Sequence, residues 1–370
     1  MSKRVLEEIL KSKDYPSFLL MNDGSEVDFD NWNTRRQEML DLLEKYSYGR
    51  TPKEDVSVCG NSKGFGPYTC AGKCTEELIE VIYKTKHGEG VIPIQLFTPT
   101  MVCNPPVILH IAFRNAPDRY IPVEEIIDRK YALVIVNYQG MVNDNCHGDY
   151  SDGIAAHFGT SINRKCDEWG KIGMWAWGAS RVLDYLIQEK KNLKTKQTAI
   201  IGHSRLGKTA LWCGAQDERF AAVISNNSGY GGAASSKHGE GERVVDFLNL
   251  GSWDWFCENF KNYKGELEDY KPYDQSFLLA LIAPRYLLVG SAELDDGADP
   301  KSEFLTTLHA SAAWEKCGVV GLVTEDRMPV PGDYFGGGNI LYHYRSGMHY
   351  LSRTDWLAYL KFLDAKFDVK

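Results

Sequence analysis

One serine lies where a short apolar segment ends and a helix-forming segment begins, in the sequence Gly202-His203-Ser204-Arg205-Leu206-Gly207-Lys208. A strand that turns sharply into a helix lifts such a serine above a parallel sheet, where its hydroxyl can attack an ester. The glycine spacing is G-x-S-x-x-G instead of the usual G-x-S-x-G, so a glycine-rich turn that binds phosphate or only packs is the alternative. The spacing of a phosphate-binding P-loop is absent. We predict that Ser204 is a nucleophile and that the backbone N–H of Arg205 stabilises the oxyanion.

A serine of ordinary pKa needs a histidine base, and the base needs an acidic side chain that orients it. In enzymes built on a strand–turn–helix serine, the acid follows a later strand and the histidine comes last. An apolar segment at residues 287–289 precedes a loop with four carboxylates. We predict that Asp295 is the acid, with Glu293 and Asp296 as alternatives, whereas Asp299 fits a helix N-cap better.

Three histidines follow this loop in the chain: His309, His343 and His349. His309 falls within a helical pattern and is expected to be structural. His349 lies in Arg345-Ser346-Gly347-Met348-His349-Tyr350, a glycine-containing loop before the last helical segment, where a mobile base belongs. We therefore predict that His349 is the base, with His343 as its rival.

Short apolar runs alternate with helical patterns along the chain and position these residues. The apolar runs suit strands that are buried on both faces of a parallel sheet, and they cover residues 107–111, 132–136, 198–201, 221–224 and 287–289. Helical patterns cover residues 28–46, 169–189 and 205–216. Two alternating segments around His87-Gly88-Glu89-Gly90 predict an antiparallel hairpin at a sheet edge, at residues 77–83 and 91–97. This order predicts an α/β-hydrolase fold, with a mostly parallel central sheet and helices on both faces.

The composition indicates a folded protein with a sizeable core, since 43% of the 370 residues are hydrophobic. Apolar segments spread over the whole chain without a low-complexity block. We therefore predict a single domain over residues 1–370 with an N-terminal helical extension at about residues 1–75. The net charge of −8 argues against nucleic acid or an anionic membrane as partner, because both attract clustered lysine and arginine.

The N-terminus, Met1-Ser2-Lys3-Arg4-Val5-Leu6-Glu7-Glu8, is charged and lacks the apolar core and cleavage site of a signal peptide. No apolar run is long enough to span a bilayer. The nine cysteines are dispersed without a CxxC pair, which is typical of reduced, mostly buried thiols. These features predict a cytoplasmic protein without a membrane anchor, or a secreted one if a signal peptide has been removed.

The segment Asn143-Asp144-Asn145-Cys146-His147-Gly148-Asp149 has the oxygen-rich start of a calcium-binding loop. The bidentate glutamate expected at the twelfth position is missing, because Ile154 occupies that position. We expect neither a metal ion nor a cofactor. The expected partner is a small-molecule or oligosaccharide ester substrate.

Several motifs together resemble bacterial members of carbohydrate esterase family 15, the glucuronoyl esterases. The resemblance covers the chain from about residue 30 to the C-terminus, and its motifs lie at residues 46–52, 202–212, 226–233, 255–260, 274–275, 279–285, 291–293, 298–300, 342–349 and 355–356. It implies an α/β-hydrolase fold and an acyl-enzyme on Ser204. The implied substrate is the ester between a glucuronic or 4-O-methylglucuronic acid carboxyl group and an alcohol, as in lignin–carbohydrate links.

The resemblance also implies roles for further side chains. The guanidinium of Arg205 would add a cation to the oxyanion hole. Lys208 would hydrogen-bond sugar hydroxyls from the helix face that carries Ser204. Glu242 is expected to contact hydroxyls of the uronic acid, with a solvated loop as the alternative. An aromatic ring that packs on the sugar is either lost or supplied by Trp253, for which core packing is the alternative.

Two positions depart from the family pattern. Asn227 stands where fungal relatives have a catalytic glutamate. An asparagine cannot stabilise an imidazolium as a carboxylate does, so the acid role falls to Asp295. Gly297 stands where the family often has a tryptophan that packs on the sugar. The sequence therefore does not determine which ester is the substrate.

Two other functions remain as alternatives. An acetylxylan-type or other sugar esterase would use the same machinery, with the sugar in the leaving group instead of the acyl group. A non-catalytic carbohydrate-binding homologue would keep the fold and lose the chemistry. The complete set of Ser204, Asp295 and His349 argues against that second alternative.

Overall fold

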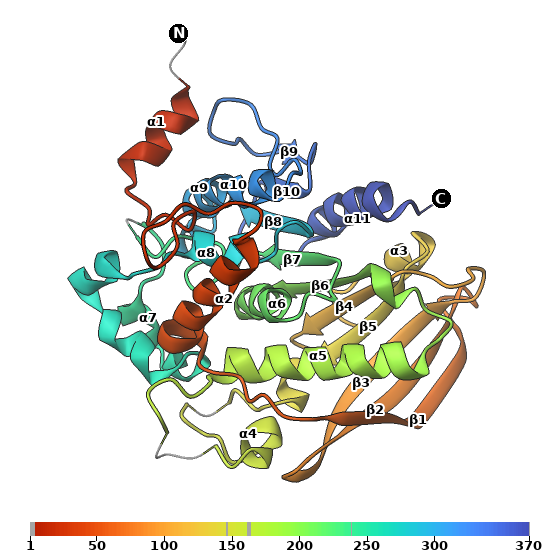
Figure 1. Cartoon of the computed structure of the whole chain (residues 1–370). Coiled ribbons are helices and arrows are strands. Elements are labelled where there is room, and N and C mark those ends of the chain that lie inside the picture. The colour runs from red at the N-terminus through yellow and green to blue at the C-terminus, as the bar shows by residue number, and fades with distance from the viewer. Residues whose placement is uncertain (1–3, 146, 161–163, 238, 370) are drawn as a thin grey trace.

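The computed structural model describes residues 4–145, 147–160, 164–237 and 239–369. One mixed sheet runs through its centre, and helices pack against both faces of that sheet (Figure 1). Among the described residues the strands lie side by side in the order β1-β2-β3-β5-β4-β6-β7-β8-β10-β9. Their bounds are β1 (Ser57–Thr69), β2 (Cys74–Thr85), β3 (Gly88–Pro99), β4 (Val107–Ala112), β5 (Ala132–Asn137), β6 (Thr198–His203), β7 (Ala222–Asn226), β8 (Tyr286–Ala292), β9 (Tyr334–Phe335) and β10 (Ile340–Arg345).

The parallel part of the sheet contains β5, β4, β6, β7, β8 and β10. In β4, β6, β7 and β10 every residue is buried, because helices cover both faces. Strands in such a place need apolar side chains on both sides, which explains their continuous apolar runs. The five predicted runs correspond to β4 to β8, and the predicted fold class is confirmed.

The sequence does not predict β10, because polar and aromatic residues interrupt its apolar pattern. Two of them, His343 and Arg345, are buried against Asp355 at the start of the last helix. Arg345 Nε donates to Asp355 Oδ2 at 2.8 Å, and His343 Nε2 lies 3.5 Å from Asp355 Oδ1. The carboxylate and nearby carbonyl groups compensate the burial of Arg345, so this polar side chain can occupy the sheet interior.

The other edge of the sheet is antiparallel. Strands β2 and β3 pair from Cys74 opposite Pro99 to Thr85 opposite Gly88, which confirms the predicted hairpin. Its predicted place at the sheet edge is wrong, because among the described residues β1 is the edge strand. Strand β1 pairs along the outer side of β2 and belongs to the sheet. The N-terminal helical extension therefore ends before residue 75, where the sequence had placed its end. The helical part of the N-terminal region ends at Tyr48, and the exposed residues of β1 show no apolar periodicity.

Alternate residues of the central strands contact two separate helical layers. Ile200 of β6 packs in the layer with α2, α5, α6, α8 and α9, whereas Ile201 packs with α3 and α11. The helices are α1 (Val5–Ser12), α2 (Trp32–Leu43), α3 (Val123–Asp128), α4 (Gly153–His157), α5 (Lys171–Glu189), α6 (Arg205–Gln216), α7 (Val244–Asn249), α8 (Gln275–Ala280), α9 (Pro300–Ala310), α10 (Ala312–Lys316) and α11 (Arg353–Phe367), with a π-helical turn at Glu44–Tyr48. Shorter 3₁₀ turns are Tyr138–Gly140, Thr195–Gln197, Ser252–Trp255, Glu258–Tyr263, Gly265–Tyr270 and Asp296–Ala298. Helices α2, α5 and α6 match the three predicted helical patterns.

Within these described ranges, no helix combines the length and the apolar character needed to cross a membrane. The cytoplasmic location expected from the sequence stays a prediction.

The turn from β6 into α6 places Ser204 at the carboxyl edge of the sheet. Ser204 has a φ of 59° and a ψ of −127°, a conformation that a side-chain-bearing residue keeps only where its surroundings enforce it. Its N–H donates to the carbonyl of Asn226 at 2.9 Å, and its carbonyl accepts from the N–H of Gly207 at 2.8 Å. A Cβ at Gly202 would lie 1.9 Å from the carbonyl oxygen of Leu206, so only glycine permits this close approach.

We expect Gly202→Ala to destabilise the fold, because the added methyl group would meet the backbone of α6 instead of a movable side chain. The expected loss is about 3 kcal/mol in the free energy of unfolding, as at other overpacked sites, and chemical denaturation measures it. Gly64→Ala in β1 is the matched control, since its methyl group would meet Leu78 at 3.4 Å. Equal stability of the two variants would contradict the close approach.

Candidate active site

A cavity of about 140 Å³ opens where β6, β7 and β8 end. Distant segments of the chain line it, and they contribute Ser204, Lys208, Asn227, Ser228, Gly229, Glu242, Asp295, Gly297, Ala298 and His349. The structure therefore brings together the nucleophile, base and acid predicted from the sequence. It also places the predicted substrate-binding residues Lys208 and Glu242 in the same cavity.

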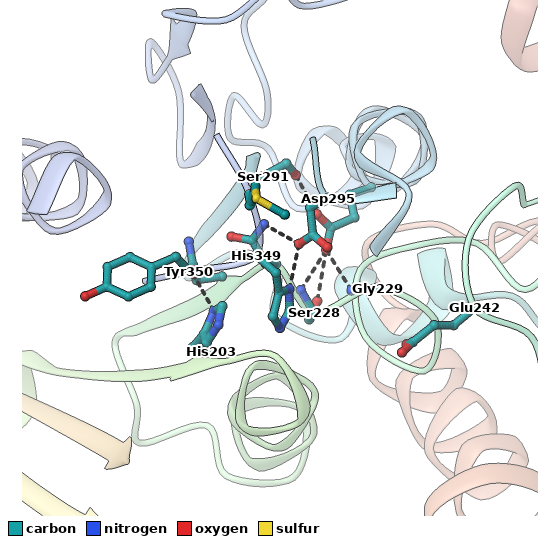
Figure 2. A network of polar contacts seen from close by, with 12 residues as sticks. His203, Ser228, Gly229, Glu242, Ser291, Asp295, His349 and Tyr350 are labelled. Atoms are coloured by element: carbon teal, nitrogen blue, oxygen red, sulfur yellow. Dashed lines mark hydrogen bonds and ion pairs between the residues drawn. The ribbon is translucent and has the colours of Figure 1, made fainter. Parts of the chain in front are cut away.

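A hydrogen bond joins the predicted base to the predicted acid (Figure 2). His349 Nδ1 lies 2.7 Å from Asp295 Oδ2, and Asn227 Nδ2 donates to the same oxygen at 2.6 Å. Burial by itself would raise the pKa of Asp295, but the hydrogen bond and charge of His349 and the amide of Asn227 lower it overall. An ionised carboxylate only accepts hydrogen bonds, so His349 donates from Nδ1 and keeps Nε2 free to take a proton.

A second histidine supports the ring of His349. The ring centroids of His203 and His349 lie 4.5 Å apart, and His203 Nδ1 contacts Asn226 Oδ1 at 2.7 Å. Burial lowers the pKa of His203 to about 3. His203 is therefore neutral at physiological pH and adds no competing charge beside His349.

The alternative acids Glu293, Asp296 and Asp299 do not line the cavity. Glu293 and Asp296 are exposed, whereas Asp295 is buried. Asp299 caps α9, and its Oδ1 accepts from the N–H of Ser302 at 3.0 Å.

Neither the rival base His343 nor the histidine expected to be structural, His309, lines the cavity. His343 lies inside β10 and faces Asp355. His309 packs against the rings of Tyr15 and Phe18.

Arg205 follows the predicted nucleophile in the chain but is not among the residues that line the cavity, and Asp144 and Trp255 hold its guanidinium. Arg205 Nη1 donates to Asp144 Oδ2 at 2.6 Å, and Trp255 Nε1 donates to Asp144 Oδ1 at 2.8 Å. The centre of the guanidinium lies 4.3 Å from the centroid of one Trp255 ring. These three side chains form a closed triangle of one ion pair, one hydrogen bond and one cation–π contact. In the sequence, Asp144 stands out only because it lies in the segment at residues 143–149, which begins like a calcium-binding loop but lacks the expected glutamate.

Lys208 is buried in the cavity wall, and burial lowers its pKa. Its Nζ donates to the carbonyl of Ser228 at 2.6 Å and lies 3.7 Å from Glu242 Oε2. Gly297 borders the same space, where a Cβ would meet only Glu242 Cγ at 4.0 Å. The cavity therefore has one buried cation, one partly exposed carboxylate and an open side.

Trp253 does not line this cavity. Lys261 Nζ lies 3.4 Å from the centroid of a Trp253 ring, and Gly148 approaches the same side chain. A role for Trp253 as a sugar platform stays a prediction.

Comparison with known proteins identifies relatives over most of the chain. Residues 104–318 match a family model described as "Glucuronyl esterase, fungi". The chain is 32% identical to carbohydrate esterase MZ0003 from an unknown prokaryotic organism, over 94% of this chain and 88% of that protein. It is 30% identical to the 4-O-methyl-glucuronoyl methylesterase of Schizophyllum commune, over 74% of this chain and 66% of that protein.

A solved structure with the same fold is the glucuronoyl esterase from Solibacter usitatus. It superposes with a TM-score of 0.86 and 33% sequence identity, over 95% of this chain and 97% of that chain. A promiscuous esterase of carbohydrate esterase family 15 from a marine bacterial metagenome superposes with a TM-score of 0.85 at 30% identity, over 95% of this chain and 96% of that chain. The chain therefore belongs to carbohydrate esterase family 15, the glucuronoyl esterases, of the bacterial type, and is a carboxylic ester hydrolase.

Proposed function

We propose that this protein hydrolyses the ester between the carboxyl group of a glucuronic acid, with or without a 4-O-methyl group, and an alcohol. The observation that carries the proposal is the 2.7 Å contact between His349 and Asp295 in the cavity that Ser204 lines. The relative from Schizophyllum commune is named a 4-O-methyl-glucuronoyl methylesterase, which supports the choice of acyl group.

Ser204, His349 and Asp295 act as nucleophile, base and orienting acid in this mechanism. His349 Nε2 takes the hydroxyl proton as Ser204 Oγ attacks the carbonyl carbon, and negative charge moves to the carbonyl oxygen. When the tetrahedral intermediate collapses, His349 gives the proton to the departing alcohol oxygen and an acyl-enzyme remains. A water molecule then repeats the sequence and releases the uronic acid.

Arg205 stabilises the oxyanion with its backbone N–H and with its guanidinium. The ion pair with Asp144 and the contact with Trp255 fix the guanidinium before the substrate arrives. Donors that are fixed in advance need no reorganisation as charge develops, which makes them effective in the transition state.

Lys208 and Glu242 bind the sugar on the acyl side of the ester. A sugar hydroxyl can donate to the carboxylate of Glu242 and accept from the ammonium of Lys208, because the two groups lie 3.7 Å apart in the cavity wall. Their contacts exist before and during the reaction, so they contribute to binding more than to the chemical step.

We expect Ser204→Ala to abolish ester hydrolysis and to leave the fold intact. The hydroxyl lost is the attacking group, whereas the backbone turn at this position stays available to alanine. Hydrolysis of benzyl glucuronate, labelling by a fluorophosphonate and the melting temperature test this together. A folded variant that keeps most of its activity would refute the assignment, and an unlabelled wild-type serine would favour the non-catalytic homologue.

The substitutions Asp295→Asn and Asn227→Ala distinguish the role of the acid from the role of the neighbouring amide. Asp295→Asn should lower kcat by about 10⁴, because an amide in that place favours the wrong histidine tautomer. Asn227→Ala removes one of two donors to the carboxylate and should cost far less. The measurement is kcat for both variants on the same ester, and the reverse order of effects would show that the acid is misplaced.

Lys208→Met tests the sugar contact, since methionine keeps the unbranched side chain as far as Cε and removes the ammonium. We expect KM for benzyl glucuronate to rise about tenfold, as for the loss of one charged hydrogen bond, with little change for p-nitrophenyl acetate. Lys190→Met is the control, because Lys190 pairs with Glu77 at 2.7 Å outside the cavity. Equal losses on both esters would show that Lys208 acts through the Ser228 loop, and would favour a general or acetylxylan-type esterase.

A further inference from the structure

Glu303 lies in the first turn of α9, fully buried, and contacts the ends of both β7 and β8. Its Oε1 accepts hydrogen bonds from the backbone N–H groups of Ser228 and Gly229, both at 2.9 Å. Its Oε2 accepts from Ser291 Oγ at 2.5 Å. Figure 2 shows Ser228, Gly229 and Ser291 close to Asp295. One carboxyl group therefore connects the strand ends that carry the candidate acid and its neighbour.

The backbone before these N–H groups has an unusual conformation. Asn227 has a φ of 47°, in the left-handed region that favours glycine. A left-handed residue turns the following N–H groups toward one point, where an anionic acceptor binds them. Glu303 supplies that acceptor, and Lys208 Nζ holds the same loop through the carbonyl of Ser228 at 2.6 Å. In this conformation Asn227 Nδ2 reaches Asp295 Oδ2 at 2.6 Å.

We propose that Glu303 is a positioning residue for the acid of the active site: it fixes the β7 and β8 loops relative to each other, so that Asn227 and His349 meet the same oxygen of Asp295. The proposal rests on the Ser204–His349–Asp295 mechanism proposed above. Glu303 is not among the residues that line the cavity, so its effect reaches the reaction only through the loops.

If residue 303 served only to fill the core, an uncharged side chain would be expected at this position. Burial raises the pKa of Glu303 from its ordinary 4.5 to about 7, so its ionised form is costly near neutral pH. An uncharged residue of similar size would avoid that cost. Stability given up in this way is typical of residues that serve a functional site.

Two substitutions separate the oxygen acceptor from the volume of the side chain. Glu303→Gln keeps an oxygen for the N–H groups of Ser228 and Gly229, whereas Glu303→Leu fills the space without an acceptor. We expect Glu303→Leu to lower kcat about tenfold with KM unchanged, and Glu303→Gln to stay within about threefold of wild type. The assays use p-nitrophenyl acetate beside benzyl glucuronate, so a wrong sugar assignment does not hide the effect.

A double-mutant cycle with Asn227→Ala tests the route of the effect. Both substitutions act on the same contact with Asp295. When Asn227→Ala is already present, the addition of Glu303→Leu should therefore lower kcat by less than about twofold. Additive losses, or an unchanged kcat in Glu303→Leu alone, would overturn the proposal.

A spectroscopic readout decides the proposal independently of turnover. The downfield proton resonance of His349 Nδ1–H reports its hydrogen bond to Asp295. We expect this resonance in the wild type and in Glu303→Gln, and its loss or shift in Glu303→Leu. An identical resonance in all three proteins would overturn the positioning role even if the proposed esterase activity were absent.

The pH dependence of stability shows whether Glu303 ionises in its buried place and whether the variants fold. Its pKa is raised in the folded state, so the folded protein holds the proton more tightly and stability falls as pH rises from about 4.5 to about 7. The melting temperature of the wild type should therefore decline relative to Glu303→Gln over this window and run parallel above it. The facing titratable groups are common to both proteins: Lys208, Asp295, Tyr342 and Tyr359. A difference that is independent of pH would overturn the buried contacts on which the proposal stands.

Discussion

A single carboxylate oxygen, Asp295 Oδ2, determines how the site is assembled. It accepts hydrogen bonds from His349 at 2.7 Å and from Asn227 at 2.6 Å, so the carboxylate cannot rotate without losing one of them. The two donors follow β10 and β7, and Asp295 follows β8, which lies between those strands. The three strand ends must therefore keep a common register. Parallel pairing of β7 with β8 and of β8 with β10 supplies that register.

Buried charges at this edge of the sheet occur in compensated sets. The buried Asp144 pairs with Arg205, whose side chain is 32% exposed, and Lys171 Nζ lies 2.8 Å from Asp254 Oδ2 with both side chains fully buried. Glu303 is satisfied by two backbone N–H groups and two hydroxyls. Desolvation makes each charge costly alone, and removal of one partner leaves the other uncompensated. Such sets hold the wall of the cavity in one arrangement, while the side chain of His349 stays 44% exposed.

Local patterns were sufficient to predict the centre of the sheet and the residues at its carboxyl edge. The runs at 198–201 and 287–289 are apolar on both sides because helices cover both faces, and the chain order then leads to Asp295 and His349. Strands β1 and β10 could not be predicted in this way, since β1 is exposed and β10 contains buried polar residues, so neither has a continuous apolar run. The contacts of Asp144 and Glu303 also could not be predicted, because they join residues 61 and 75 positions apart in the chain. Only the folded arrangement brings such residues together.

The contact between Asn227 and Asp295 has a consequence for how this family can change. Position 227 lies one hydrogen bond farther from the histidine than Asp295, and a glutamate there is one methylene longer than asparagine. Such a side chain extends its carboxylate toward the position of Asp295 Oδ2, in line with the glutamate that the resemblance implies for fungal relatives. Either of the two strand ends can therefore direct a carboxylate toward the histidine while the serine, the histidine and the sheet stay in place. The place of the acid is set by the space between the loops that follow β7 and β8, and a side chain from either loop can point into that space.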